Sequence, residues 1–194
     1  MGGSIDDRSN GYEAVASEYI ARRHPSIGVS TVRAWARSLS GTAVLDLGCG
    51  HGVPISIALV DDGFAVFGID ASPAMVAAFR HRLPQAPVAC EPVEDSPFFA
   101  RTFDGILAWG LMFLLPAESQ RALIARSASV LNPGGSFLFA SPARPSTWAD
   151  ALTGRRSVSL GAEVYRAVLS SAGMVVVSEY LDEGGNYYYE AAKR

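Results

Sequence analysis

The sequence has little cysteine and almost no lysine, and both shortages restrict what it can bind. Its two cysteines, Cys49 and Cys90, form neither a Cys-x-x-Cys pair nor the Cys/His spacing of a metal site. We therefore expect no metal centre and interpret both thiols as reduced, small apolar side chains. Lys193 is the only lysine, the arginines are scattered, and the net charge is -3. Because no basic stripe could neutralise phosphates, we expect no nucleic-acid partner.

Long hydrophobic runs are also missing. Gly, Pro, Asp or Arg interrupts each apolar run well before the ~18 residues of a membrane-spanning helix, so we expect no membrane segment. Residues 1–7 carry neither a basic start with an apolar stretch nor an Arg-rich amphipathic pattern, which favours a cytoplasmic protein. A length of 194 residues with 49% hydrophobic and 18% charged residues is typical of one globular domain, residues 1–194.

Two amphipathic helices are expected near the start of the chain. Apolar and aromatic residues recur at spacings of three and four over residues 12–24, which predicts a helix with Tyr12 and Tyr19 on one face. A second helix is expected over 27–39, with Ser26 as its cap. The polar tail before Tyr12 is expected to be loose.

Strands and helices alternate from residue 44 onward, which predicts an α/β fold with a doubly wound sheet. The long stretch 141–159, rich in Pro, Ser and Arg, is expected to be a functional loop. The two last strands should form an antiparallel hairpin across a Gly-rich turn. The expected strands are 44–47, 65–69, 88–90, 104–109, 136–140, 174–181 and 187–192, and the expected helices are 53–60, 73–83, 116–131 and 162–172.

A glycine-rich turn follows the first of these strands. The strand ends in Val44-Leu45-Asp46-Leu47, and the turn reads Gly48-Cys49-Gly50-His51-Gly52. Glycines permit left-handed backbone and a close approach to a ligand. Asp70 ends the next strand about 20 residues further on, where a carboxylate can accept hydrogen bonds from both hydroxyls of a ribose. The glycine-rich turn and Asp70 together predict a nucleoside ligand beyond the carboxyl ends of the strands.

The turn lacks the third glycine of a dinucleotide-binding G-x-G-x-x-G pattern, because Val53 and Pro54 follow Gly52. Asp46, inside the end of the strand, would repel a pyrophosphate but could hold the ammonium group of an amino acid. An adenosine that carries an amino acid, rather than a second nucleotide, satisfies both observations.

Residues 44–52 resemble the first motif of the class I S-adenosylmethionine-dependent methyltransferases, in particular small bacterial-type members. Asp70 with Ala71, Ser72, Pro73 and Met75 resembles the family's second motif, in which the acid binds ribose and the next residues flank adenine.

The resemblance continues through the second half of the core. Residues 103–106 with Trp109 resemble the family's fourth strand, and 131–135 its turn before strand five. The matching motifs cover roughly residues 12–140 in order. They imply a Rossmann-like, doubly wound sheet of seven strands, mostly parallel with an antiparallel last strand, and helices on both faces.

The resemblance implies S-adenosylmethionine as cofactor and S-adenosylhomocysteine as product. Where relatives often place an Asp to meet the adenine amino group, this chain offers Glu91, Glu94 or Asp95, and we favour Glu94 beside the backbone of Val93. The helix that normally follows strand three should be short or missing. The residues expected to contact the cofactor are Tyr12, Tyr19, Asp46, Gly48, Cys49, Gly50, Asp70, Ala71, Met75, Val93, Glu94 and Trp109.

Residues 1–40 are expected to form a helical lid over a core made by 41–194, with Tyr12 and Tyr19 approaching the carboxylate end of the cofactor. Arg22 and Arg23 could neutralise that carboxylate or an acidic substrate, although solvated charges are the commoner role of such residues.

The expected reaction is in-line methyl transfer to a small-molecule acceptor. The sequence offers no evident catalytic base, and orienting the two reactants can supply much of the acceleration. The acceptor pocket is expected between the N-terminal helices, residues 109–113, and the loop from Ser141 through Trp148 to Arg156. Two alternative functions would require the same adenosine-binding residues: a nicotinamide-dependent oxidoreductase and a non-catalytic S-adenosylmethionine- or S-adenosylhomocysteine-binding protein. Acceptor identity and oligomeric state stay open.

Overall fold

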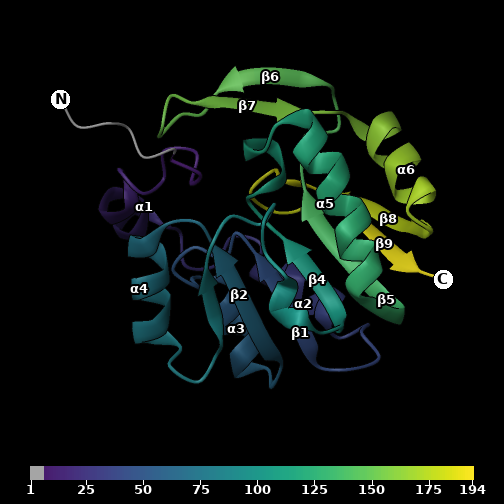
Figure 1. Ribbon diagram of the computed structural model, residues 1–194, viewed down its shortest axis with the longest axis horizontal. Helices are drawn as coiled ribbons and strands as arrows, with labels where there is room; N and C mark the ends of the chain where they lie inside the picture. Colours follow the sequence, from purple (N-terminus) through teal and green to yellow (C-terminus); the bar gives the residue numbers. More distant parts are fainter. Residues whose placement is uncertain (1–6) are drawn as a thin grey trace.

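The computed structural model describes residues 7–194 and has a seven-stranded sheet of order β3-β2-β1-β4-β5-β9-β8 (Figure 1). Neighbouring strands are parallel except that β9 is antiparallel to β5 and β8. The predicted doubly wound sheet with one reversed strand is confirmed. The strands are β1 (Ala43–Leu47), β2 (Ala65–Asp70), β3 (Val88–Cys90), β4 (Phe103–Ala108), β5 (Leu131–Ala140), β8 (Met174–Leu181) and β9 (Tyr187–Lys193).

Helices cover both faces of the sheet, as the alternation of elements predicts. In Figure 1, α5 and α6 lie on the near face, while α2 and α3 lie behind the sheet. Each face has its own apolar core, and the central strand β1 contributes side chains to both. The helices are α1 (Ala16–Arg22), α2 (Val29–Ala36), α3 (Ile55–Asp61), α4 (Pro73–Arg82), α5 (Ala117–Val130) and α6 (Ala162–Ser171), with short 3-10 helices η1 (Phe98–Ala100) and η2 (Met112–Leu114).

Helix α4 begins where the sequence predicts. The hydroxyl of Ser72 accepts a hydrogen bond from the backbone N–H of Met75 at 3.1 Å, and Pro73 occupies the first helical position. After β3 the chain forms only η1 in place of a full helix, in agreement with the prediction for this segment. Among the described residues, no helix is long and apolar enough to cross a membrane.

The N-terminal helices are shorter than predicted. Helix α1 begins at Ala16 rather than at Tyr12, and α2 begins after Gly28 rather than at a cap formed by Ser26. A long-range contact determines where α2 begins. Gly28, the residue before the helix, has a left-handed φ of 79°, and its N–H donates to the carboxylate of Glu183 at 3.0 Å.

The polar tail is not loose where the structure describes it. The carboxylate of Asp7 accepts hydrogen bonds from the backbone N–H groups of Ser9 and Gly11, both at 3.0 Å, and from the Ser9 hydroxyl. The prediction for residues 7–11 is therefore wrong, because a local Asp-centred turn orders them. The rest of the predicted tail, residues 2–6, lies outside the described residues.

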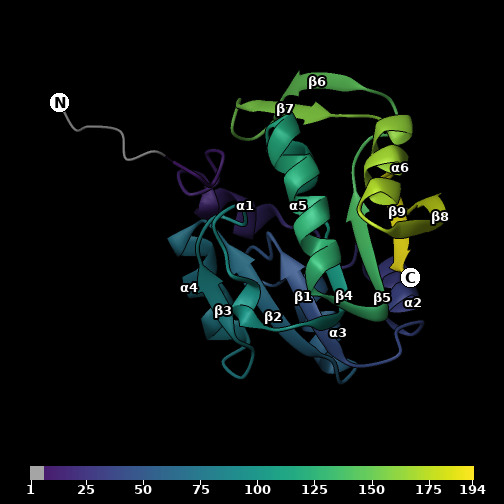
Figure 2. The ribbon, with the colours of Figure 1, turned by 45° about the vertical axis from the view of Figure 1, so that its right-hand side comes forward.

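The stretch predicted as a long loop contains a second, two-stranded sheet. Strands β6 (Ser146–Ala149) and β7 (Arg156–Ser159) pair antiparallel, and the side chain of Asp150 caps the turn by accepting from Leu152 N–H and Thr153 N–H. This hairpin lies beyond one end of the main sheet (Figure 1) and next to the start of α5 (Figure 2). The prediction that residues 141–159 form a long loop is therefore wrong, because this stretch contains a β-hairpin.

Cys49 is buried and Cys90 is exposed, and both are free thiols. The interpretation of Cys90 as an apolar filler is wrong, since it ends β3, a three-residue strand at the edge of the sheet.

A buried polar network anchors the hairpin to the core. The hydroxyl of Tyr165, a fully buried residue, donates to Gln120 Oε1 at 2.6 Å and lies 2.8 Å from the hydroxyl of Ser141. The Gln120 amide in turn donates to the carbonyl oxygens of Leu115 and Val158. The network therefore joins α5, α6, the end of β5 and the hairpin.

We expect Tyr165→Phe to lower the free energy of unfolding by about 1–3 kcal/mol, because it leaves the buried Gln120 oxygen without its donor. Tyr180→Phe is the matched control, since the Tyr180 hydroxyl reaches only Glu190 at 3.4 Å, and its effect should stay within about 0.5 kcal/mol. Chemical denaturation measures both variants, and equal losses would contradict the anchoring role.

Candidate functional site

A cavity of about 240 Å³ lies beyond the carboxyl ends of β1, β2 and β4. Its walls come from the glycine turn after β1, the junction of β2 and α4, and the loop after β3. The segment between β4 and α5 and the N-terminal segment complete the enclosure. This is the edge at which open parallel sheets bind ligands.

Nine of the twelve residues that the sequence nominates line this cavity, and Asp46, Cys49 and Trp109 do not. Of the three acids considered for the adenine amino group, only Glu94 is at the cavity wall. The nine lining residues are Tyr12, Tyr19, Gly48, Gly50, Asp70, Ala71, Met75, Val93 and Glu94.

The glycine turn has the left-handed backbone that its sequence implies, with φ of 68° at Gly48, 55° at Gly50 and 85° at Gly52. A Cβ at Gly48 would lie 2.9 Å from Cβ of Leu111, whereas a Cβ at Gly50 would meet nothing within 4 Å. Gly48 is therefore required for packing, and Gly50 faces open space at the cavity wall.

Asp70 joins the glycine turn to the start of α4. One carboxylate oxygen accepts from Gly50 N–H at 2.8 Å and the other accepts from Ser72 N–H at 2.9 Å. Burial raises the pKa of Asp70, and these two hydrogen bonds oppose the increase. Each oxygen keeps a lone pair that can accept a further hydrogen bond.

Asp46 lies behind the cavity wall. It is 3% exposed, and its carboxylate accepts a hydrogen bond of 2.5 Å from the hydroxyl of Ser56. Burial raises its pKa to about 7, while the Ser56 hydrogen bond and the charge of Arg23 oppose the increase. Asp46 therefore titrates near neutral pH.

Trp109 and Cys49 do not line the cavity. The indole N–H of Trp109 donates to the hydroxyl of Tyr188, and the guanidinium of Arg23 lies 4.0 Å from the ring centroid. Cys49 packs in the apolar cluster around Phe79. Both side chains belong to the helix-covered face of the sheet on which α2, α3 and α4 lie.

Three buried polar atoms in or beside this region have no hydrogen-bond partner among the described residues: Nδ2 of Asn10, Nε of Arg23 and Nδ1 of His51. Burial lowers the pKa of His51 to about 4, so its ring is neutral at physiological pH. The Tyr19 ring packs edge-on to His51 with centroids 5.9 Å apart, and edge-on to Tyr12 at 5.4 Å.

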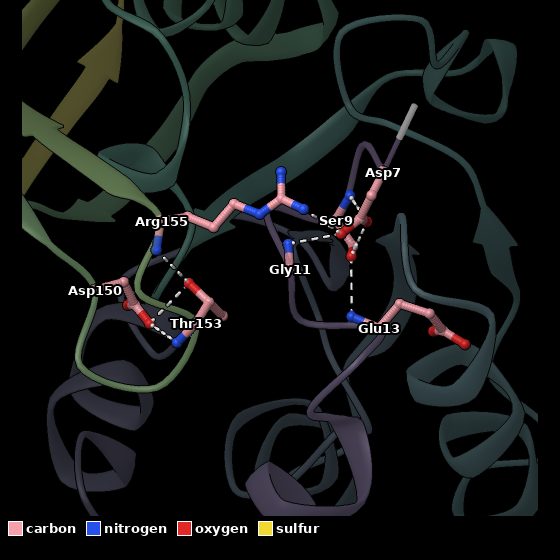
Figure 3. A network of polar contacts seen from close by, with 7 residues as sticks. All are labelled: Asp7, Ser9, Gly11, Glu13, Asp150, Thr153 and Arg155. Carbon is pink, nitrogen blue, oxygen red and sulfur yellow. Dashed lines mark hydrogen bonds and ion pairs between the residues drawn. The ribbon is translucent and has the colours of Figure 1, made fainter. Parts of the chain in front are cut away.

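The N-terminal segment crosses the cavity and is fastened on both sides. On one side Arg155, at the turn of the hairpin, pairs with Asp7 at 3.4 Å, and Tyr12 donates its hydroxyl hydrogen to Asp150 at 3.2 Å (Figure 3 shows Asp7, Asp150 and Arg155). On the other side the carboxylate of Glu13 accepts from the Ser72 hydroxyl and from the N–H of Ala74.

The loop after β3 is held by Arg126 of α5. Its guanidinium donates to the carbonyl oxygens of Val93, Glu94 and Ser96, and lies 4.4 Å from the ring centroid of Phe98. These bonds fix the segment that carries Val93 and Glu94 at the cavity wall.

Sequence reasoning missed residues 7–10 of the wall, and it assigned residues 109–113 of the apolar segment after β4 to the acceptor pocket, whereas Gly110, Leu111 and residues 114–116 line this cavity. The run Leu111-Met112-Phe113-Leu114-Leu115, directly after a strand end, was an available signal for this apolar part of the wall. Residues 7–11 form a local turn around Asp7, but their place at the cavity also depends on Arg155, which is 148 positions from Asp7 and gives no local signal.

Comparison with known proteins supports the predicted family. Residues 44–135 match the model of a methyltransferase domain. An uncharacterized methyltransferase of Synechocystis is 37% identical over 109 residues, covering 56% of this chain and 50% of that protein. The cypemycin N-terminal methyltransferase of a Streptomyces species is 34% identical over 156 residues, covering 76% and 63%. The chain thus spans half to less than two thirds of these relatives.

Residues 44–135 thus match a methyltransferase domain, the kind of domain that the sequence motifs indicate. This match agrees with the predicted class I S-adenosylmethionine-dependent family. A Synechocystis magnesium protoporphyrin IX methyltransferase with bound S-adenosylmethionine has the same fold, with a TM-score of 0.76 at 17% identity over 100% of both chains. A Streptomyces caelestis methyltransferase, CcbJ, gives 0.75 at 15% identity over 96% of this chain and 97% of its own.

Asp46 supplies a pH-dependent prediction. Its pKa is about 7 in the folded protein against a reference of 3.8, so the folded state binds a proton that the unfolded state has released between these values. Its contribution to stability therefore falls as pH rises through this window. We expect the stability of Asp46→Asn, relative to wild type, to increase by about 3 kcal/mol from about pH 4.5 to about pH 8.

Denaturation curves across this pH range measure the effect. Asp61→Asn is the control, because Asp61 is exposed at the end of α3 and its removal should leave the pH profile unchanged. Parallel profiles for Asp46→Asn and wild type would show that Asp46 is ionised throughout.

Proposed function

We propose that the chain transfers the sulfonium methyl group of S-adenosylmethionine to a small-molecule acceptor by in-line displacement. A lone pair of the acceptor atom attacks the methyl carbon, and the electrons of the breaking C–S bond go to sulfur. The products are S-adenosylhomocysteine and the methylated acceptor, whose displaced proton passes to water. The observation that carries the proposal is the carboxylate of Asp70, fixed at the cavity wall by the N–H of Gly50, a glycine that faces open space.

The residues present fit such a cofactor. Asp70 would accept hydrogen bonds from the ribose hydroxyls, because each of its oxygens has a lone pair that the backbone does not use. Met75 and Val93 supply apolar walls for adenine, with Glu94 at the rim. The amino-acid end would lie toward Tyr19, where the unpartnered nitrogens of Arg23 and His51 could serve its carboxylate and the buried Asp46 its ammonium.

The protein's own contribution to the reaction is orientation and exclusion of water. Tyr12 is not a phenolate base, because burial raises its pKa and it donates its hydrogen to Asp150. Placing donor and acceptor in line can supply much of the acceleration for a good leaving group. Related folds support a small acceptor, since they include an amino pentose methyltransferase of Micromonospora echinaspora, with a TM-score of 0.66.

Calorimetry with S-adenosylhomocysteine tests the proposal. Wild type should bind it, and Asp70→Asn should bind it at least about tenfold more weakly, because hydrogen bonds from ribose to a charged acceptor are lost. Asp61→Asn removes an exposed carboxylate and should bind as wild type does. Binding of reduced nicotinamide dinucleotide instead of S-adenosylhomocysteine would select an oxidoreductase. Tight binding of S-adenosylhomocysteine without methyl transfer to any acceptor would indicate a non-catalytic cofactor-binding protein.

Residues 1–40 act in this proposal as a lid, whose described part is closed by the Asp7–Arg155 pair. The series Arg155→Lys, Arg155→Gln and Arg155→Glu should increase the dissociation rate of S-adenosylhomocysteine progressively. Arg155→Gln should increase this dissociation rate about two- to fivefold, because an exposed ion pair contributes little free energy.

Stopped-flow displacement measures the rates. Arg22→Gln breaks an exposed ion pair with Glu18 that does not touch the hairpin, and should leave the rate unchanged. Equal rates throughout the Arg155 series would show that the cofactor leaves without opening this contact.

A further inference from the structure

A second cavity, of about 520 Å³, lies between the end of β5, the hairpin and the turn that joins β8 to β9. We call it the β5 groove. It is lined by apolar and aromatic side chains, among them Phe113, Trp148, Leu181 and Tyr187, together with one charged side chain, Arg144.

The β5 groove adjoins the cofactor cavity across a single short segment. Leu111 and Leu114 line the cofactor cavity, whereas Phe113, between them in the sequence, lines the groove. Strands β4 and β5 are parallel neighbours, so the cavity after β4 and the groove after β5 open at the same edge of the sheet. The segment that contains η2 therefore borders both the groove and the cofactor cavity.

The floor of the groove is fixed before anything binds. The backbone N–H of Ser141 donates to Tyr187 O at 2.9 Å, and the Ser141 hydroxyl belongs to the Tyr165 network. On the opposite wall, the amide of Asn186 donates to Asp182 at 2.8 Å. A preformed wall reduces the ordering cost that a ligand would otherwise meet.

The aromatic walls suit a flat ligand. The rings of Phe113 and Trp148 have centroids 5.7 Å apart at an interplanar angle of 41°. Leu181 is 64% exposed, which is high for a leucine and leaves apolar surface at the rim of the groove. Planar aromatic ligands gain from such surfaces both by burial and by ring contacts.

The charge of the groove suits an anion. Within residues 7–194 no carboxylate lies within ion-pair distance of Arg144, whereas seven other ion pairs are formed. No aspartate or glutamate is among the lining residues. A guanidinium without a protein partner, at the edge of an aromatic groove, matches a carboxylate in geometry and sign.

We infer that the β5 groove binds the methyl acceptor, and that the acceptor is an aromatic carboxylic acid carrying a separate hydroxyl or amino group. The carboxylate pairs with Arg144, the ring lies against Phe113 and Trp148, and the hydroxyl or amino group extends past η2 toward the cofactor. That group is methylated by the displacement already described, and the carboxylate is not. The inference rests on the proposed function and deepens it.

Matched acids and amides test this assignment. Hydroxy- and amino-substituted benzoates, cinnamates and indole carboxylates, each with its carboxamide, are titrated into the protein saturated with S-adenosylhomocysteine. We expect at least one acid to bind about five- to tenfold more tightly than its amide. Arg144→Gln should abolish that preference and leave amide binding within about twofold.

Arg156→Gln is the control, because Arg156 is an exposed arginine of the same hairpin that does not line the groove, and it should keep the preference. Trp148→Ala should weaken acid and amide equally, which separates ring packing from charge. In turnover, Arg144→Gln should raise KM for the acid with little change in kcat.

Two results would overturn the inference: equal affinity of every acid and its amide, or the same loss in Arg144→Gln and Arg156→Gln. Binding of S-adenosylhomocysteine with no binding of any acid would also overturn the acceptor class while leaving the proposed function intact. Failure to bind S-adenosylhomocysteine would overturn the proposed function itself.

Discussion

The position of the Asp70 carboxylate is the constraint on which the site depends. It accepts from Gly50 N–H and Ser72 N–H, and so fastens the glycine turn after β1 to the first residues of α4. Removing water from a carboxylate is costly unless hydrogen bonds replace it, and here two backbone groups do so. The same two bonds leave lone pairs at the cavity wall, so the arrangement that stabilises the two turns also prepares the ligand contact.

The sequence predicts the parts of this arrangement that depend on neighbours in the chain. A buried apolar strand, glycines with positive φ, an acid at the end of β2 and the cap formed by Ser72 are each local features. Their combination identifies the cavity, because parallel strands bring all their carboxyl ends to one edge. The doubly wound sheet could therefore be predicted from the order and periodicity of its elements, whereas the starts of α1 and α2 could not.

The remaining parts of the site depend on contacts between distant residues. Trp109 donates to the hydroxyl of Tyr188, which follows it by 79 positions, instead of lining the cavity. The N-terminal segment is held against the hairpin by Arg155, which is 148 positions from Asp7. Periodicity and turn chemistry contain no information about such pairs. For the same reason the hairpin within 141–159 appears in the sequence only as a polar stretch.

The hairpin joins the two halves of the site. Its turn holds the segment that covers the cofactor cavity, through Asp150 and Arg155, and its first strand supplies Trp148 to the β5 groove. The network around Tyr165 and Gln120 fixes its base to the core, so a shift of the hairpin would change both cavities together. Two binding events that act on one rigid element are coupled, and by thermodynamic linkage the coupling is reciprocal. Cofactor closure and acceptor binding should therefore be coupled through the hairpin, in addition to the direct contact that methyl transfer requires between the two ligands.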